Sequence, residues 1–97
     1  MNFENKVVLV TGAARGLGQE YARQFAHRGA NVVACDLRSC DETLAVIEAE
    51  GAVGLALETD VTSADSTAAM AATVADRFGG IDVLVNNAAL YGSLTFL

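Results

Sequence analysis

The sequence contains no proline and no tryptophan, and only two cysteines and one histidine among its 97 residues. Cys35 and Cys40 match neither a C-x-x-C redox motif nor the spacing of zinc ligands, so we expect two free thiols in a reducing compartment. His27 has no candidate metal ligands near it in the sequence and is expected to be a solvated residue near a helix end. These scarcities argue against a disulfide scaffold and against a metal site.

Basic residues are also few, because six Lys and Arg stand against twelve Asp and Glu, a formal net charge of -6. This charge repels nucleic acid and anionic lipid. The longest apolar runs, residues 7–10 and 81–85, are far shorter than the roughly 20 residues that a membrane span needs. Asn2, Glu4 and Asn5 interrupt the beginning of the chain in a way that a signal peptide does not. We therefore expect a cytoplasmic protein with neither a nucleic-acid nor a membrane partner.

Apolar and helical segments alternate along the chain, in which 53% of the residues are hydrophobic. Short apolar runs predict buried strands at residues 6–11, 31–37, 53–58 and 81–85. Helical periodicity or propensity predicts helices at residues 17–28, 41–50 and 64–78. The first helix should bury Leu17, Tyr21, Ala22, Phe25 and Ala26, the second should turn Leu44 and Ile47 inward, and Ser63 should cap the third.

Strands that alternate with helices across short connections imply right-handed crossovers and a parallel sheet with helices on its faces. The expected fold class is therefore α/β, a Rossmann-type doubly wound sheet with the strand order 3-2-1-4. A doubly wound domain normally has more than four strands. We thus expect residues 1–97 to be the amino-terminal, nucleotide-binding part of a single domain whose sheet is incomplete and whose remainder is absent.

A glycine-rich segment, T-G-A-A-R-G-L-G at residues 11–18, lies between the first strand and the first helix. Backbone N–H groups and the dipole at the start of a helix form a binding site for a pyrophosphate. Gly12 would permit the tight turn, Gly16 the close approach of the ligand, and Gly18 the packing of helix on strand. A purely structural glycine-rich turn is the alternative.

Polar residues follow the other three strands. Asp36 ends the second strand, where a carboxylate can accept hydrogen bonds from both hydroxyls of an adenosine ribose, although a solvated loop aspartate is the alternative. Asp60 and Val61 follow the third strand. Asn86 and Asn87 follow the fourth, and buried amides of this kind need hydrogen-bond partners. We expect an ordered polar cluster beside the binding crevice, with a structural role for Asn87.

Together, the T-G-x-x-x-G-x-G, terminal acid, D-V and N-N-A motifs of residues 6–89 resemble the amino-terminal part of the short-chain dehydrogenase/reductase family. The resemblance implies an oxidoreductase that transfers hydride between NAD(P) and an alcohol or carbonyl substrate. It also implies the cofactor contacts: Gly12, Arg15, Gly16, Leu17 and Gly18 on the pyrophosphate and adenosine side, Asp36 at the adenine ribose, Asp60 and Val61 at the adenine ring, and Asn86 and Ala88 near the ribose of the nicotinamide.

The chain departs from the family pattern in two respects. Ala89 stands where the family usually has glycine, which would cost about 1 kcal/mol of local strain if the position needs a positive φ. The family also uses a serine and a tyrosine with a lysine four residues later. Here Tyr21 is followed by Phe25, and Tyr91 by Thr95. No catalytic residue is therefore assigned, and the 97-residue chain is expected to be inactive alone.

Charge next to the ribose favours NAD over NADP, because a 2′-phosphate would lie beside the Asp36 carboxylate. Arg15 and Arg38 could instead pair with that phosphate. A non-catalytic nucleotide-binding or interaction module remains the alternative function. A Rossmann-like methyltransferase is a third possible function, but the Thr-Gly of residues 11–12 and the Asn-Asn-Ala of residues 86–88 argue against it. A homo-oligomer is expected for the full-length form alone, and the sequence does not identify the substrate.

Overall fold

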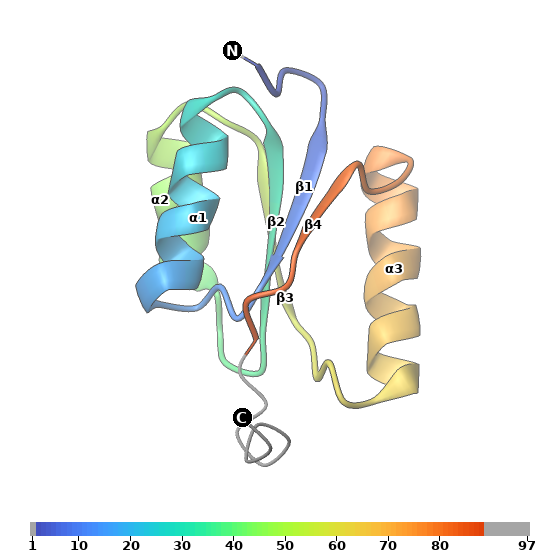
Figure 1. The fold of residues 1–97 in the computed structure, drawn as a ribbon. Helices are drawn as coiled ribbons and strands as arrows, with labels where there is room; N and C mark the ends of the chain where they lie inside the picture. Colours follow the sequence, from blue (N-terminus) through green and yellow to red (C-terminus); the bar gives the residue numbers. More distant parts are fainter. Residues whose placement is uncertain (1, 89–97) are drawn as a thin grey trace.

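The computed structural model describes residues 2–88, which form a parallel sheet with helices on both faces (Figure 1). The elements in chain order are β1 (Val7–Thr11), α1 (Gly16–His27), β2 (Asn31–Asp36), α2 (Asp41–Ala49), β3 (Gly54–Glu58), α3 (Ala64–Phe78) and β4 (Val83–Val85). Helices α1 and α2 cover one face of the sheet, and α3 covers the other.

The four strands are parallel and lie in the order β3-β2-β1-β4, which confirms the predicted Rossmann-type topology. In the middle of the sheet, Val10 of β1 pairs with Ala34 of β2 on one side and with Val85 of β4 on the other. The chain runs outward from β1 to β3 and then returns to the opposite side of β1. This reversal leaves a crevice at the carboxyl ends of the central strands, the usual position of a ligand in such a sheet.

Alternate residues of β1 enter the two layers of the core. Val8 and Val10 pack with residues of α1 and α2 such as Ala22 and Ile47, whereas Val7 and Leu9 pack against α3 at Val74. Every residue of β1 is buried. A strand with both faces covered favours apolar side chains, which explains the apolar run of residues 7–10 that precedes Thr11.

Helix α1 differs from the sequence expectation at its first turn, because Leu17 is 60% exposed. The buried positions of α1 are Gly18, Ala22 and Ala26, which are four residues apart and lie on one face of the helix. Leu17 precedes the first of them and is rotated by about 100° away from that face. Glycine, which carries no apolar side chain, thus takes the position expected for leucine.

Two other details differ from the expected segments. Strand β4 begins two residues later than predicted, because Asp82 accepts a hydrogen bond from the Val7 N–H through its carboxylate (2.8 Å) and leaves Ile81 outside the ladder. In α2, Ile47 is buried as predicted, but the buried position one turn before it belongs to Thr43, whereas Leu44 is half-buried.

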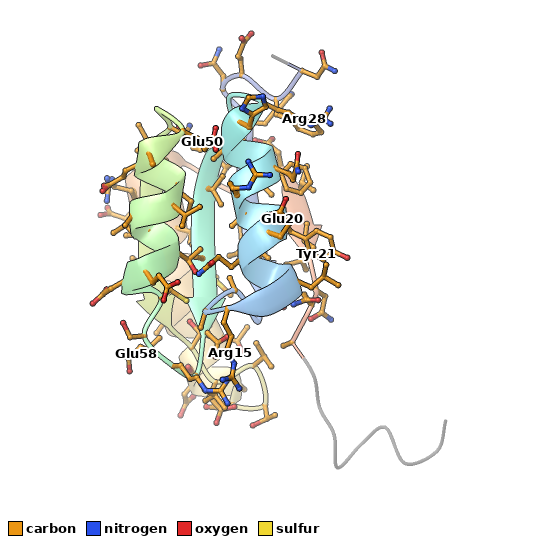
Figure 2. All side chains as sticks on the ribbon, turned by 90° about the vertical axis from the view of Figure 1, so that its left-hand side faces the viewer. Arg15, Glu20, Tyr21, Arg28, Glu50 and Glu58 are labelled. Atoms are coloured by element: carbon orange, nitrogen blue, oxygen red, sulfur yellow. The ribbon has the colours of Figure 1, made fainter. Side chains whose placement is uncertain are left out.

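Helices α1 and α2 lie side by side on their face of the sheet (Figure 2). Glu50, directly after α2, is 3.3 Å from the Arg23 guanidinium and 3.0 Å from Nδ1 of His27 at the last turn of α1. The hydrogen bond with His27 is the main reason that the pKa of Glu50 is lowered. These contacts join the two helices at the end remote from the carboxyl ends of the strands, and their exposure limits their contribution to stability.

The described residues contain neither a helix suited to a lipid bilayer nor a cluster suited to a metal ion. None of the helices within residues 2–88 combines the length and the apolar character that a membrane crossing requires. In the same part of the chain, no three side chains of His, Cys, Asp or Glu converge as metal ligands.

Helix α3 begins with the predicted cap, since the Ser63 hydroxyl accepts a hydrogen bond from the Ser66 N–H at 3.2 Å. We predict that Ser63→Ala lowers the free energy of unfolding by about 1 kcal/mol, because an N–H of the first turn loses its acceptor. Urea denaturation measures this change. Ser63→Thr keeps the hydroxyl and serves as the control, and equal stability of Ser63→Ala and the unmodified protein would contradict the prediction.

Candidate functional site

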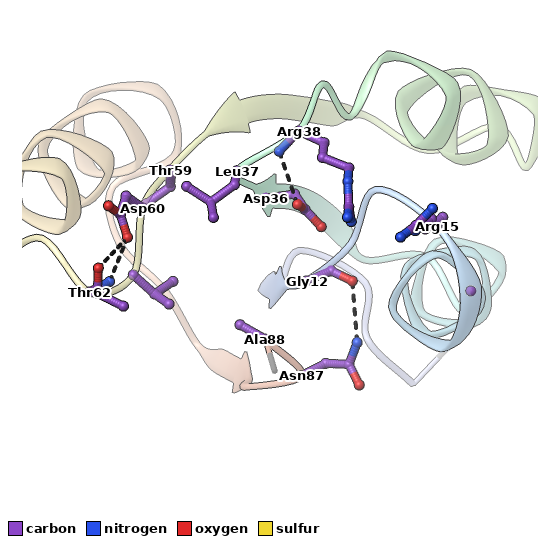
Figure 3. A pocket seen from close by; sticks show the side chains of 12 residues that line it. Gly12, Arg15, Asp36, Leu37, Arg38, Thr59, Asp60, Thr62, Asn87 and Ala88 are labelled. Carbon is purple, nitrogen blue, oxygen red and sulfur yellow. Dashed lines mark hydrogen bonds between the residues drawn. The ribbon is translucent and has the colours of Figure 1, made fainter. Parts of the chain in front are cut away.

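A cleft of about 670 Å³ opens at the carboxyl ends of the strands (Figure 3). Its walls are the segments that follow the four strands. They contribute Gly12, Arg15 and Gly16 after β1, Asp36, Leu37 and Arg38 after β2, Thr59, Asp60, Val61 and Thr62 after β3, and Asn87 and Ala88 after β4. The fold thus collects in one place polar and glycine residues that are far apart in the sequence.

The turn after β1 is packed closely against the segment after β4. Gly12 has a φ of +64°, and a Cβ atom there would lie 2.9 Å from the Asn87 carbonyl oxygen and 3.0 Å from the Ala88 Cα. A Cβ atom on Gly18 would collide with the Gly12 carbonyl oxygen and lie 2.7 Å from Nδ2 of Asn87. Gly16 differs, because a Cβ atom there would meet nothing within 4 Å. Two of the glycines therefore permit close packing, whereas Gly16 borders open space in the cleft.

The Thr11 hydroxyl joins the end of β1 to the end of β4. It donates to Oδ1 of Asn86 (3.0 Å) and accepts from the N–H groups of Asn87 (2.9 Å) and Ala88 (3.1 Å). The Asn87 side chain in turn donates to the Gly12 carbonyl (3.2 Å), a contact drawn in Figure 3. The two asparagines are thus hydrogen bonded, and they join the segments that follow β1 and β4 at the cleft.

The amino terminus of α1 carries no side-chain cap. Its N-cap residue is Arg15, which makes no capping hydrogen bond, and its first turn contains no acidic residue. The first turn of α2 contains Asp41, and α3 has the Ser63 cap. The first N–H groups of a helix lack intrahelical acceptors, and the helix dipole places partial positive charge there. This end of α1 borders the cleft at Gly16 and is suited to an anionic group.

Asp36 lies at the tip of β2, half-buried, with a hydrogen bond to each carboxylate oxygen. Its Oδ2 accepts from the Ala14 N–H and its Oδ1 from the Arg38 N–H, both at 3.0 Å. Each carboxylate oxygen can accept a further hydrogen bond, so the group remains available to hydroxyl donors of a ligand. The two backbone contacts hold the carboxylate in one orientation.

Arg15 and Arg38 place two cations on the same side of the cleft as Asp36 (Figure 3). Both residues are exposed, and within residues 2–88 neither guanidinium makes a hydrogen bond or an ion pair. The arginines can therefore turn to solvent more freely than the Asp36 carboxylate can.

The wall formed by the segments after β2 and β3 combines apolar and polar groups. Leu37 is 69% exposed and Val61 is half-buried, so both offer apolar surface to a ligand. In the same wall, Oδ1 of Asp60 accepts hydrogen bonds from the hydroxyl (2.6 Å) and the N–H (2.9 Å) of Thr62, which lower the pKa of the Asp60 carboxyl. The Asp60 carboxylate thus stabilises the turn that it forms with Thr62.

The structure brings most of the sequence-predicted site residues together, but not all of them. Those that line the cleft are Gly12, Arg15, Gly16, Asp36, Asp60, Val61 and Ala88. Leu17 is exposed outside the cleft, Gly18 is buried behind the turn, and the Asn86 side chain contacts Thr11. Ala89 and Tyr91 lie outside the described residues.

Sequence reasoning missed three residues of the wall, Leu37, Thr59 and Thr62. Leu37 had a recognisable signal, because it directly follows Asp36 at the carboxyl end of a strand, where ligands bind in a parallel sheet.

Both cysteines are free, as predicted, and buried. Burial raises the pKa of the Cys35 thiol to about 11 and that of the Cys40 thiol to about 12. They belong to core clusters on opposite faces of the sheet. A buried thiol with a raised pKa is a poor nucleophile, so these residues act as small core side chains.

Comparison with known proteins identifies the relatives of this arrangement. Residues 6–97 match the family model described as short chain dehydrogenase. Galactitol 2-dehydrogenase of Agrobacterium fabrum is 43% identical over 91 residues, which are 94% of this chain and 35% of that enzyme.

Two solved structures have the same fold. Hydroxysteroid dehydrogenase from Escherichia coli superimposes with a TM-score of 0.86 and 34% identity, over 90% of this chain and 38% of that one. A metagenomic short-chain oxidoreductase in complex with NADP gives a TM-score of 0.82 and 37% identity, over 93% of this chain and 42% of that one. The chain spans less than half the length of each of these three relatives.

Proposed function

The chain belongs to the short-chain dehydrogenase family, and from this premise we propose that residues 1–97 are the cofactor-binding part of an NAD-dependent oxidoreductase. The reaction of the whole protein would be hydride transfer between the nicotinamide cofactor and a small alcohol or carbonyl substrate. The dehydrogenases among its relatives support this reaction class. The buried free thiols fit a reducing, cytoplasmic location.

One observation carries the proposal: the cleft joins the uncapped amino terminus of α1 to the Asp36 carboxylate at the tip of the neighbouring strand. A dinucleotide has a pyrophosphate, which suits the helix N–H groups, and an adenosine ribose, whose hydroxyls suit a carboxylate acceptor. Gly16 leaves open space where the pyrophosphate would approach. The residues present therefore fit the cofactor.

The remaining assignments follow the walls of the cleft. We assign Gly12, Arg15 and Gly16 to the pyrophosphate, Asp36 to the adenine ribose, Asp60 and Val61 together with Leu37 to the adenine ring, and Ala88 to the ribose of the nicotinamide. Gly18 would contribute indirectly, because it lets α1 pack closely against Gly12 and Asn87. The roles of Leu17 and Asn86 rest on the family resemblance, because neither residue lines the cleft.

We infer a preference for NAD from the contrast between Asp36 and the two arginines. The carboxylate is held by two backbone N–H groups, so a 2′-phosphate would meet a fixed negative charge, a repulsion of about 1 to 3 kcal/mol at a partly screened site. Arg15 and Arg38 would have to be ordered before they could offset it. One relative is in complex with NADP, so NADP is the competing cofactor in the titrations that test this preference.

A bound nicotinamide ring would supply the hydride acceptor or donor. The part played by this chain is to bind and orient the cofactor. The amino terminus of α1 would bind the negatively charged pyrophosphate, and Asp36 would accept hydrogen bonds from the ribose hydroxyls. The contacts of Asn87 with Thr11 and Gly12 keep the strand ends in place. No tyrosine of the chain is followed four residues later by a lysine, so proton transfer is assigned to none of these 97 residues.

Isothermal titration of the full-length protein with NAD tests the proposal. We predict saturable binding with a dissociation constant between about 1 μM and 1 mM, the range usual for enzyme substrates and cofactors. NADP and S-adenosylmethionine are titrated in parallel. If neither dinucleotide binds up to a few millimolar, or if S-adenosylmethionine binds more tightly than both, the proposed function is wrong.

A further inference from the structure

The glycine-rich turn is held from behind by two side chains that do not line the cleft. The hydroxyl of Thr43, in α2, is fully buried and donates to the Ala13 carbonyl at 2.6 Å. It accepts a hydrogen bond from Nε2 of Gln19, in α1, at 3.0 Å, and the same amide group donates to the Ala14 carbonyl at 3.3 Å. Two helices thus contact the turn through one connected set of hydrogen bonds.

These contacts complete the hydrogen bonding of two successive residues of the turn. The N–H of Ala13 donates to the Cys35 carbonyl at 3.0 Å, and the N–H of Ala14 donates to the Asp36 carboxylate at 3.0 Å. Both N–H groups are therefore directed to β2, while both carbonyls are directed to the Thr43 and Gln19 side chains. The turn cannot shift along β2 without breaking bonds to the helices.

The buried hydroxyl of Thr43 is not needed for packing. Valine has nearly the same shape and would fill this site beside Ile47 without a polar atom, whereas a buried hydroxyl is tolerated when its hydrogen bonds are made. The hydroxyl has both a donor and an acceptor role here. Its effect is to fix the Ala13 carbonyl, and through it the turn that leads into the first turn of α1.

We propose that Thr43 and Gln19 are positioning residues for the cofactor: they hold the glycine-rich turn in place before the dinucleotide arrives. The inference rests on the proposed function, because the turn and the N–H groups that follow it are assigned to the pyrophosphate. A turn that is already ordered loses less conformational entropy when the ligand binds, which raises the affinity.

Binding of NAD and of adenosine to variants of the full-length protein tests this role, with Thr43→Val and Gln19→Met as the disruptive changes and Thr43→Ser and Thr73→Val as the controls. In Thr43→Val and Gln19→Met, the dissociation constant for NAD should rise about tenfold. The dissociation constant for adenosine, which has no phosphate, should change less than about twofold, because Asp36 keeps its bond from the Arg38 N–H. Thr43→Ser retains the hydroxyl and should restore NAD binding to within about threefold.

Thr73→Val is the matched control, since its hydroxyl donates to a carbonyl of its own helix, α3, at the exposed surface. It should leave both ligands unaffected. Circular dichroism establishes that each variant is folded, and if Thr43→Val does not fold, Gln19→Met at a half-buried position decides the question.

Two results would overturn the inference while leaving the proposed function intact. In the first, the folded variants bind NAD as tightly as the unmodified protein. In the second, NAD and adenosine lose affinity equally, which would indicate general damage rather than positioning of the turn. If the unmodified protein itself binds no dinucleotide, the proposed function fails, and the inference fails with it.

Discussion

Gly18→Ala should lower the free energy of unfolding by about 3 kcal/mol and abolish binding of the dinucleotide. The added methyl group would collide with the Gly12 carbonyl oxygen and with Nδ2 of Asn87. There is little free space next to Gly12 to relieve this collision, since even a Cβ atom there would meet the Asn87 carbonyl and Ala88. The collision would therefore separate α1 from the segments that follow β1 and β4.

Gly16→Ala and Gly51→Ala provide matched comparisons. Both glycines have a positive φ, +60° and +85°, and open space where a Cβ atom would lie, so each change should cost about 1 kcal/mol of backbone strain. Gly16 lines the cleft, whereas Gly51 follows α2 at the opposite end of the sheet. We expect weaker NAD binding for Gly16→Ala and unchanged binding for Gly51→Ala.

Urea denaturation and isothermal titration with NAD distinguish the three variants. If Gly18→Ala is as stable as Gly51→Ala, the predicted collision at Gly18 does not occur. Equal NAD affinity of Gly16→Ala and Gly51→Ala would show that the space beside Gly16 does not receive the cofactor.

The fold could be predicted from the sequence because β1 and β2 are buried on both faces and therefore appear as apolar runs, whereas β3 and β4 are only partly buried. The strand order followed from the doubly wound arrangement that alternating strands and helices predict. The ends of elements were less predictable. Asp82 stops β4 early through a hydrogen bond to Val7, and a contact across 75 residues leaves no local pattern. Leu17 was misplaced because a buried glycine occupies the face that apolarity alone assigns to leucine.

The site was predictable to the extent that its residues follow strand ends. Gly12, Gly16 and Asp36 could be found in this way, and all three line the cleft. The hydrogen bonds that hold the turn could not be found, because Thr43 joins Ala13 across 30 residues. One signal was present, since Thr43 and Ile47 are four residues apart and share the buried face of α2. A buried threonine needs a hydrogen-bond partner, but the sequence does not distinguish the Ala13 carbonyl from a carbonyl one turn earlier along the chain, the acceptor that Thr67 and Thr73 use.

Cofactor preference should reverse when the Asp36 carboxylate is removed. In Asp36→Ala, NAD should bind about tenfold more weakly, because the ribose hydroxyls lose their acceptor, and NADP should bind about tenfold more tightly, because the 2′-phosphate no longer meets a fixed negative charge. The ratio of the two dissociation constants should thus change about a hundredfold in favour of NADP. Titration of the unmodified and the variant proteins with both cofactors measures this ratio.

Asp76→Ala is the matched control, because it changes the net charge equally but removes an exposed carboxylate of α3 that does not line the cleft. It should leave the ratio unchanged. Arg38→Ala, introduced into Asp36→Ala, should weaken NADP but not NAD if Arg38 then pairs with the 2′-phosphate, and added salt should reduce the same gain. The NAD assignment is wrong if the unmodified protein already binds NADP more tightly than NAD. An unchanged ratio in Asp36→Ala would show instead that the carboxylate acts on the turn through the Ala14 N–H rather than on the ribose.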